Sequence, residues 1–324
     1  MIIRRLGALV AGLVATTALV AAPAQAAPPP GYSVPIAQLN DSLTCSGNPR
    51  TGPTPVLLVP GTTLTPDVNF DWNYAKAFSA QGRAWCWVEL PKNAMGDIQV
   101  NAEHVVHGIR TLRAAAGRKI SVVGFSQGGM VPRWALKFWP DTRPMVDDLV
   151  GLDPSNHGTL DAYPICLPGC APAFWQQQTG SKFLQKLNEG QETYAGISYT
   201  QVYTATDEVV VPNFGPFASS RLTTGPGAKS NVLVQSICPV HVSEHLSMGT
   251  SDPVGYALVM DALKNVGPGQ ASRIDRRVCL QPFMPAVTAD SFARNFPRVV
   301  AQAGEQILVA DRVPAEPALA PYAR

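Results

Sequence analysis

Residues 119–139 read KISVVGFSQGGMVPRWALKFW. An apolar run at 119–123 precedes the pentapeptide Gly-x-Ser-x-Gly at 124–128, and a segment of helical character follows at 129–139. A sharp strand-to-helix turn leaves no room for side chains at its two glycine positions, and it lifts the serine out at the top of the sheet. The stretch therefore predicts a nucleophile elbow with Ser126 at its tip.

Strand and helix patterns alternate on both sides of this elbow. They predict strands at 55–59, 84–90, 145–152, 199–204 and 231–237, and helices at 71–82, 98–116 and 252–264. This β-α-β order predicts an α/β fold in which a mostly parallel sheet carries helices on both faces. We find no linker and no internal repeat, so we expect one domain over residues 27–324.

The first 26 residues have the composition of a secretory signal peptide. Arg4 and Arg5 precede an uncharged run at 6–22, and the small-residue pattern Ala-Gln-Ala ends at Ala26. The run is too short and too diluted by glycine and threonine to favour a membrane anchor. We expect cleavage near Ala26 and secretion, with no integral membrane association. The remaining chain has equal numbers of basic and acidic residues, which argues against a nucleic-acid partner.

The chain has six cysteines, an even number that suits three disulfides in an exported protein. The sequence Cys166-Leu-Pro-Gly-Cys170 contains a turn that brings its ends to disulfide distance, so we predict a bridge between them. The other pairings stay open at this point. A zinc site would need a second closely spaced ligand pair, which is absent from the sequence.

A serine nucleophile needs a base, and the base needs an acid that fixes its tautomer. In serine hydrolases of this topology the order along the chain is serine, acid, histidine. His241 and His245 both follow the strand at 231–237, and we prefer His245 because it lies in the segment that leads to the last helix. His104 and His107 lie before the nucleophile, and we interpret them as solvent-facing residues of the helix at 98–116.

Asp207 is the predicted acid because it directly follows the strand at 199–204, where parallel sheets place functional residues. Its neighbour Glu208 is an alternative, and Asp153 is a weaker one. The oxyanion of an acyl-transfer reaction needs hydrogen-bond donors. The elbow rule assigns these donors to the backbone N–H of Gln127 and to Thr62, whose hydroxyl can add a further one.

The regular alternation breaks at 154–196, where turns, prolines and apolar residues predominate. We interpret this segment as a small cap over the site; a structural excursion packed on the core is the alternative. The segment 296–324 is rich in alanine and proline, and we expect it to wrap the surface. The predicted substrate pocket contains Phe125, Ser155, His157, Ile165 and Leu167.

Several strings in the chain are uncommon: LTC at 43–45, LLVPGT at 57–62, DIQVN at 97–101, SQGG at 126–129, WQQ at 175–177, YTATDEV at 203–209 and PYAR at 321–324. On these strings the chain resembles the lipase B branch of the α/β-hydrolase superfamily, which contains a yeast lipase and its bacterial relatives. The resemblance extends over nearly the whole chain after residue 26. It implies an α/β-hydrolase fold with Ser126, Asp207 and His245 as the catalytic triad and with Thr62 and Gln127 at the oxyanion hole.

The resemblance also implies disulfides Cys45–Cys86 and Cys238–Cys279. Near the site the chain departs from the yeast lipase at three positions: Phe125 replaces a tryptophan, Thr63 stands where a glycine is expected, and Ser155 replaces a buried acid. These differences concern the preferred chain length and stereoselectivity more than the type of reaction.

These observations together predict a secreted, monomeric serine lipase that cleaves acylglycerols or other lipophilic esters through an acyl-enzyme, without metal or cofactor. A polyester depolymerase, a short-chain esterase and an acyltransferase are alternatives that use the same site. An inactive lipid-binding or surface-binding homologue is the alternative from another class.

Overall fold

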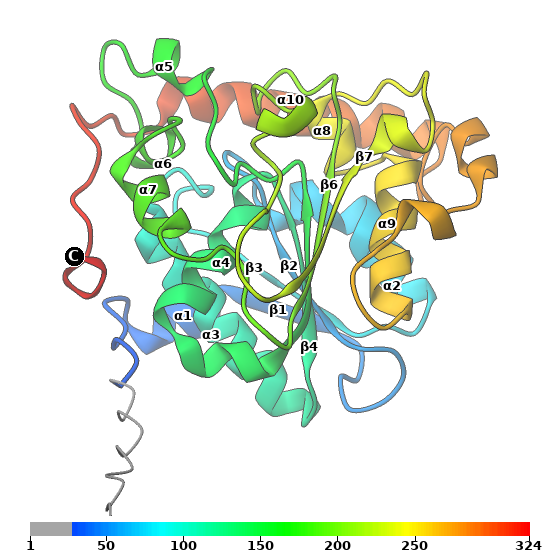
Figure 1. Cartoon of the computed structure of the whole chain (residues 1–324), viewed down its shortest axis with the longest axis horizontal. Helices are drawn as coiled ribbons and strands as arrows, with labels where there is room; N and C mark the ends of the chain where they lie inside the picture. The colour runs from blue at the N-terminus through cyan, green and yellow to red at the C-terminus, as the bar shows by residue number, and fades with distance from the viewer. Residues whose placement is uncertain (1–27) are drawn as a thin grey trace, which may run out of the picture.

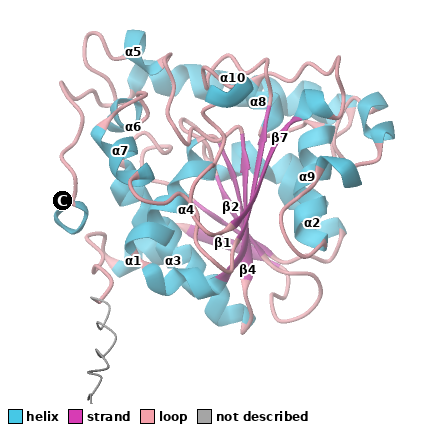
Figure 2. Cartoon of the chain, viewed as in Figure 1, coloured by secondary structure: helices cyan, strands magenta, loops and turns pink. Residues whose placement is uncertain are grey.

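A seven-stranded sheet forms the centre of the protein, with helices on both of its faces (Figure 1, Figure 2). The computed structural model describes residues 28–324, so the predicted signal peptide lies outside the described residues. The strands are β1 (Leu43–Ser46), β2 (Val56–Val59), β3 (Trp85–Val88), β4 (Ile120–Phe125), β5 (Val146–Leu152), β6 (Ser198–Tyr203) and β7 (Ala228–Leu233). Their order in the sheet is β1-β3-β2-β4-β5-β6-β7, and β1 alone pairs antiparallel. The predicted α/β-hydrolase architecture is confirmed.

Both faces of the sheet are buried, which explains the continuous apolar runs of the central strands. In β2, Leu57 and Val59 pack into one hydrophobic cluster, and Val56 and Leu58 pack into the other. This alternation follows from the two-residue period of a strand. The helices are α1 (Ile36–Asp41), α2 (Lys76–Ala80), α3 (Ile98–Ala116), α4 (Gln127–Phe138), α5 (Ala162–Ile165), α6 (Pro172–Gln176), α7 (Lys182–Asn188), α8 (His245–Met248), α9 (Pro253–Lys264) and α10 (Ala289–Val309).

Local capping signals set the ends of the long helices. Asp97 caps α3 by accepting a hydrogen bond from the backbone N–H of Gln99, and Gly117 ends the helix in the left-handed conformation. Asp252 caps α9 in the same way, with Pro253 in the first helical position. The predicted bounds of both helices are therefore close to the observed ones.

Three expectations about helices are wrong in detail. The helix expected at 71–82 starts earlier, as a π-helical segment, η1 (Asp67–Ala75), and continues into α2. Helix α4 starts at Gln127, earlier than the expected segment at 129–139, so Pro132 lies in its second turn. The segment expected to wrap the surface from residue 296 is helical as far as Val309, because α10 accommodates Pro297 in its interior.

Helix α10 is itself largely exposed, with only Ser291 and Val299 buried, and the residues after it run along the surface beside α6 and α7 (Figure 1). Even this part is anchored at its end. The carboxylate of Glu316 accepts hydrogen bonds from the first two backbone N–H groups of α7, and the indole N–H of Trp134 donates to the Tyr322 hydroxyl. Ala323 is buried in the same cluster as Trp134.

All three predicted disulfides are present. Cys45–Cys86 links β1 to β3, Cys166–Cys170 closes the short turn after α5, and Cys238–Cys279 links the segment after β7 to the segment after α9. Among residues 28–324, none of the helices combines the length and apolar character needed to cross a membrane.

Candidate active site

The candidate site lies at the carboxyl edge of the sheet, where the loops after five strands come together. Strands β2, β4, β5, β6 and β7 are consecutive in the sheet, so the segments that follow them form a row. These segments carry Thr62, Ser126, Asp153, Asp207 and His245 in that order. Parallel α/β sheets bind their ligands at this edge.

Ser126 has the strained backbone of a nucleophile elbow, with φ 54° and ψ −123°. The two glycines of the motif are needed for steric reasons. A Cβ atom at Gly124 would lie 1.9 Å from the carbonyl oxygen of Gly128, and one at Gly128 would lie 2.1 Å from the carbonyl oxygen of Val59. The backbone N–H of Ser126 donates to Leu152 O, which ties the turn to β5. The strand-turn-helix context predicted for Ser126 is therefore confirmed.

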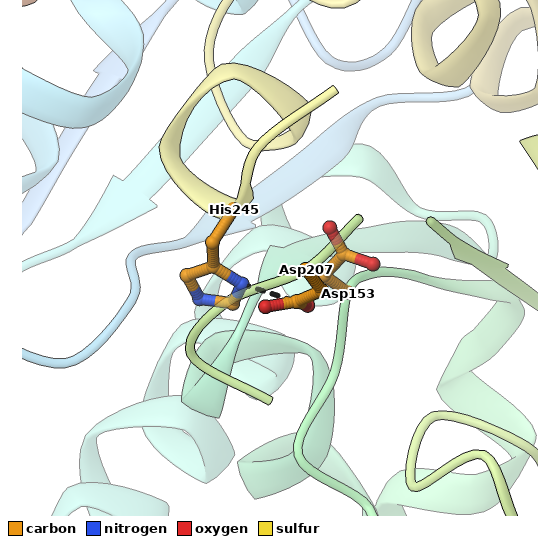
Figure 3. A group of neighbouring side chains, drawn as sticks. All are labelled: Asp153, Asp207 and His245. Atoms are coloured by element: carbon orange, nitrogen blue, oxygen red, sulfur yellow. Dashed lines mark hydrogen bonds and ion pairs between the residues drawn. The ribbon is translucent and has the colours of Figure 1, made fainter. Parts of the chain in front are cut away.

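His245 is the first residue of α8, and its Nδ1 atom lies 3.0 Å from Asp207 Oδ2 (Figure 3). Both side chains are almost completely buried. The other carboxylate oxygen, Oδ1, accepts the backbone N–H groups of Val209 and Val210. Glu208 has a different role, since it accepts the backbone N–H of His245 and does not contact the ring.

The bond through Nδ1 leaves Nε2 as the nitrogen of His245 that can accept a proton. Burial opposes protonation of the imidazole, but the negative charges of Asp207, Glu208 and Glu244 outweigh this effect and raise the pKa of His245 above its ordinary value. A buried histidine whose charged form is stabilised by a carboxylate suits a general base.

The two residues predicted for the oxyanion hole contact each other. The Nε2 amide of Gln127 donates to Thr62 Oγ1 at 3.0 Å, and Gln177 donates to the same oxygen from the segment after α6. Because Thr62 Oγ1 accepts two hydrogen bonds, its own proton can be donated to a third partner. Gln127 begins α4, and the first N–H groups of a helix have no acceptor within the helix.

A cavity of about 210 Å³ is lined by both Ser126 and His245. Its wall also contains Thr62, apolar side chains of the 154–196 segment such as Ile165 and Phe174, and Ile307 of α10. Of the predicted pocket residues, Phe125, Ser155 and Ile165 line this cavity, whereas His157 and Leu167 do not. His157 instead pairs with Glu192 at 2.8 Å, and Leu167 is 86% exposed.

The remaining histidines lie outside the cavity. His104 and His107 were expected to face solvent, but both are buried against the core side of α3, and burial lowers the pKa of His104 to about 4. His241, the alternative base, binds Asp252 at 2.5 Å rather than Asp207. The predicted preference for His245 thus corresponds to the histidine that the fold brings to the cavity of Ser126.

Asp153, Asp207 and His245 are near enough to one another for metal binding, with one ligand atom from each within 4.8 Å. Their donor pattern argues against that use. Each oxygen of Asp207 already accepts two N–H groups, since Asn213 Nδ2 also donates to Oδ2 at 3.1 Å. A carboxylate saturated by N–H donors is arranged as a hydrogen-bond acceptor.

Sequence reasoning did not find Asn213, whose amide nitrogen donates to both Asp207 and Asp153. Asn213 follows the cis peptide bond between Val211 and Pro212 in the long connection between β6 and β7. A proline before an asparagine is common in turns, so no local signal marked this residue.

Comparisons with known proteins agree with this geometry. Residues 53–245 match the family model for lipase (class 2). The chain is 35% identical to lipase B of Pseudozyma antarctica over 91% of this chain and 86% of that protein. The crystal structure of Aspergillus fumigatus lipase B is 31% identical and superposes with a TM-score of 0.86 over 95% of this chain and 76% of that one. The chain therefore belongs to the class 2 lipase family and is a carboxylic-ester hydrolase.

Proposed function

We propose that the protein is a secreted serine lipase in which Ser126, His245 and Asp207 form the catalytic triad. The observation that carries the proposal is the buried hydrogen bond between His245 and Asp207 at the cavity that also contains the elbow serine. A serine, a histidine and a carboxylate in this chain order are the parts that ester hydrolysis through an acyl-enzyme requires.

In the proposed reaction, Ser126 Oγ attacks the carbonyl carbon of the ester while His245 Nε2 takes the hydroxyl proton. The negative charge that develops on the carbonyl oxygen is stabilised by the Gln127 backbone N–H and by Thr62. His245 then gives its proton to the leaving alcohol, and the acyl group stays on Ser126. Water then attacks the acyl carbon and loses a proton to His245, which gives that proton to Ser126 Oγ as the bond to the acyl group breaks and the carboxylic acid leaves. Asp207 stabilises the imidazolium in both halves of the cycle.

The proposed substrates are lipophilic esters such as acylglycerols. The apolar wall of the cavity favours an acyl chain over a polar group. Its volume is below the usual range of about 300–1,000 Å³ for sites that enclose a whole ligand, so a long chain would extend beyond the cavity. Exposed apolar side chains of α5, of the turn after it and of the end of α10, including Tyr163, Leu167 and Leu308, supply a surface where a lipid aggregate could dock.

Secretion is part of the proposal. The three disulfides support it, because such bonds persist in oxidising compartments. The proposed cleavage site after Ala26 is tested by determining the N-terminal sequence of the exported protein.

The experiment that tests the function combines active-site labelling with turnover. Purified protein is treated with a fluorophosphonate and digested, and the adduct is located by peptide mass mapping. We expect the adduct on Ser126 and not on Ser155, the other serine that lines the cavity. Hydrolysis of p-nitrophenyl esters from acetate to palmitate then gives the chain-length preference.

Turnover that rises toward long chains supports a lipase, whereas activity on short chains alone indicates an esterase. The Ser126→Ala variant should lose turnover and labelling while remaining folded. Retained esterase activity in that variant would overturn the assignment of the nucleophile, and a folded wild-type protein with neither adduct nor turnover would indicate an inactive homologue.

A further inference from the structure

A second carboxyl group lies directly behind the acid of the proposed triad. Asp153 follows β5, the strand next to β6, which leads to Asp207. Figure 3 shows the side chains of Asp153 and Asp207 side by side, on the Nδ1 side of the His245 ring. Asp153 has no exposed surface, and its backbone φ of 41° lies in the left-handed region, which is strained for this residue type.

The hydrogen bonds of the two carboxyl groups are unequal. Asp207 accepts four N–H donors, two on each oxygen. Asp153 Oδ1 accepts the backbone N–H of Thr204 and the side-chain amide of Asn213. Asp153 Oδ2 is buried, and within residues 28–324 it has no hydrogen-bond partner. An ionised carboxylate oxygen that is buried without a hydrogen-bond donor has an unfavourable solvation free energy. A protonated oxygen carries no charge and can donate a hydrogen bond.

The negative charges around Asp153 and Asp207 also favour a protonated Asp153. Asp153 faces Asp207 and, more distantly, Asp252, while Glu208 and Glu244 lie near His245. Burial, together with the charges of Asp207 and Asp252, raises the pKa of Asp153 well above that of an ordinary aspartate. The imidazole of His245 can balance one buried negative charge next to it but not two.

We propose that Asp153 is a positioning residue of the hydrolytic site, which in its uncharged form holds Asn213 in place against Asp207 and adds no second negative charge beside that carboxylate. The inference rests on the triad proposed above. Its effect is that a single negative charge faces His245 although two carboxyl groups are present. With two charges the imidazolium would be stabilised too strongly, and His245 would be a poorer acid toward the leaving alcohol.

The strained backbone supports this role. The N–H of Asp153 donates to Val202 O, and its Oδ1 binds the N–H of Thr204, so one residue fastens the end of β5 to the end of β6. Asparagine tolerates the left-handed region better than most residues, and like a protonated aspartate it is uncharged and pairs a carbonyl acceptor with a donor group, here NH₂ in place of O–H. Asp153→Asn is therefore the conservative variant, and Asp153→Ala removes both the acceptor and the donor group.

The test measures the dependence of kcat/KM on pH for p-nitrophenyl butyrate in the wild type and in both variants. We expect Asp153→Ala to lower kcat roughly 10-fold to 100-fold with little change in KM, because Asp207 loses its support. Asp153→Asn should recover most of that loss. The acid limb, which reports the pKa of His245, should keep its position in Asp153→Asn because no charge is removed.

Asp148 offers a matched control on the same strand. It is also a buried carboxyl, with a pKa raised by burial to about 7, but it binds Ser121 at the opposite end of β5. Asp148→Asn should leave kcat and the acid limb unchanged. At about pH 9, where a carboxyl group with the pKa of Asp148 is ionised, infrared spectra should contain the carbonyl stretch of a protonated carboxyl group in the wild type and in Asp148→Asn, and this band should be lost in Asp153→Asn.

A charged Asp153 would give a different result. A unit charge about 5 Å from the imidazole, at an effective dielectric constant of about 20, shifts its pKa by about two units. An acid limb that moves down by that amount in Asp153→Asn, or an Asp153→Ala enzyme with wild-type kcat, overturns the inference. An incorrect assignment of the triad can be distinguished from an incorrect role for Asp153. In the first case the Asp207→Asn variant would keep its activity.

Discussion

Replacing Asp207 by asparagine is the sharpest test of the acid, because the structure fixes what the new amide would meet. Four N–H donors converge on the carboxylate: Val209 and Val210 at Oδ1, and Asn213 and His245 at Oδ2. An amide has one acceptor oxygen, so its NH₂ group must face two other donors whichever way it turns.

If the amide oxygen in the Asp207→Asn variant keeps the hydrogen bonds from the backbone N–H groups of Val209 and Val210, its NH₂ group lies against His245. The ring then takes the other tautomer, with its proton on Nε2, and cannot accept the proton of Ser126. In serine hydrolases the wrong tautomer lowers kcat roughly 10⁴-fold, which corresponds to about 5.4 kcal/mol of transition-state stabilisation. We expect a loss of this size in the release of p-nitrophenol during the first turnover, with the near-ultraviolet circular dichroism of the folded enzyme retained.

Glu208→Gln is the matched control for the rival acid. The glutamine oxygen can still accept the backbone N–H of His245. We therefore expect a loss of less than about tenfold, the worth of a single hydrogen bond. Its acid limb should move slightly to lower pH, because one of the charges that raise the pKa of His245 is removed. A folded Asp207→Asn enzyme that keeps a tenth of the activity, or an equal loss in Glu208→Gln, would refute the assignment.

Three further predictions concern stability. Gly124→Ala should cost at least about 3 kcal/mol of unfolding free energy in urea titrations, since its Cβ would overlap a backbone oxygen, whereas Gly304→Ala on the open face of α10 should be neutral or stabilising. Removing the Cys45–Cys86 bridge by double serine substitution frees a loop of 41 residues, so we expect about 4 kcal/mol and a Tm lower by about 8 °C in calorimetry. Protonated His241 donates a hydrogen bond to the Asp252 carboxylate, which raises the pKa of His241 above its ordinary value of 6.5. The stabilisation from this pair is therefore complete below pH 6.5 and is lost as the pH rises through the higher pKa of the folded state. His241→Gln should therefore be less stable than the wild type at about pH 5.5, and the difference should shrink in alkaline buffer; a difference that grows instead would contradict the sign.

The features that were predicted correctly from the sequence, such as the elbow turn and the helix ends, are those that neighbouring residues determine. The apolar run before Ser126 and the glycines around it leave few alternatives to a strand and a tight turn. The bounds of α3 were predictable because Asp97 and Gly117 are strong start and stop signals. The order serine, aspartate, histidine then indicated which residues to expect at the carboxyl edge.

Features that depend on distant partners were missed. Nothing local distinguishes buried from exposed histidines on an amphipathic helix, so His104 was placed on the wrong side. The alanine and proline content of residues 296–324 gave no sign of a helix, but α10 extends to Val309, and its Val299 is buried in the core. Asn213 becomes a candidate site residue only because its amide reaches both Asp207, in the same connection, and Asp153, which follows β5.

The anchoring of Tyr322 to Trp134 has a consequence for biosynthesis. The two residues are separated by 188 positions, and the aromatic cluster between them includes Trp139, whose ring centroid lies 5.0 Å from that of Tyr322. At roughly 5 to 20 residues per second, a ribosome needs about 10 to 40 s to travel from one to the other. During that interval the side chains of Trp134, Phe138 and Trp139 lack part of their cover and can adhere to other nascent chains. Slower initiation or a holding chaperone should therefore raise the yield of folded enzyme more than stronger transcription does.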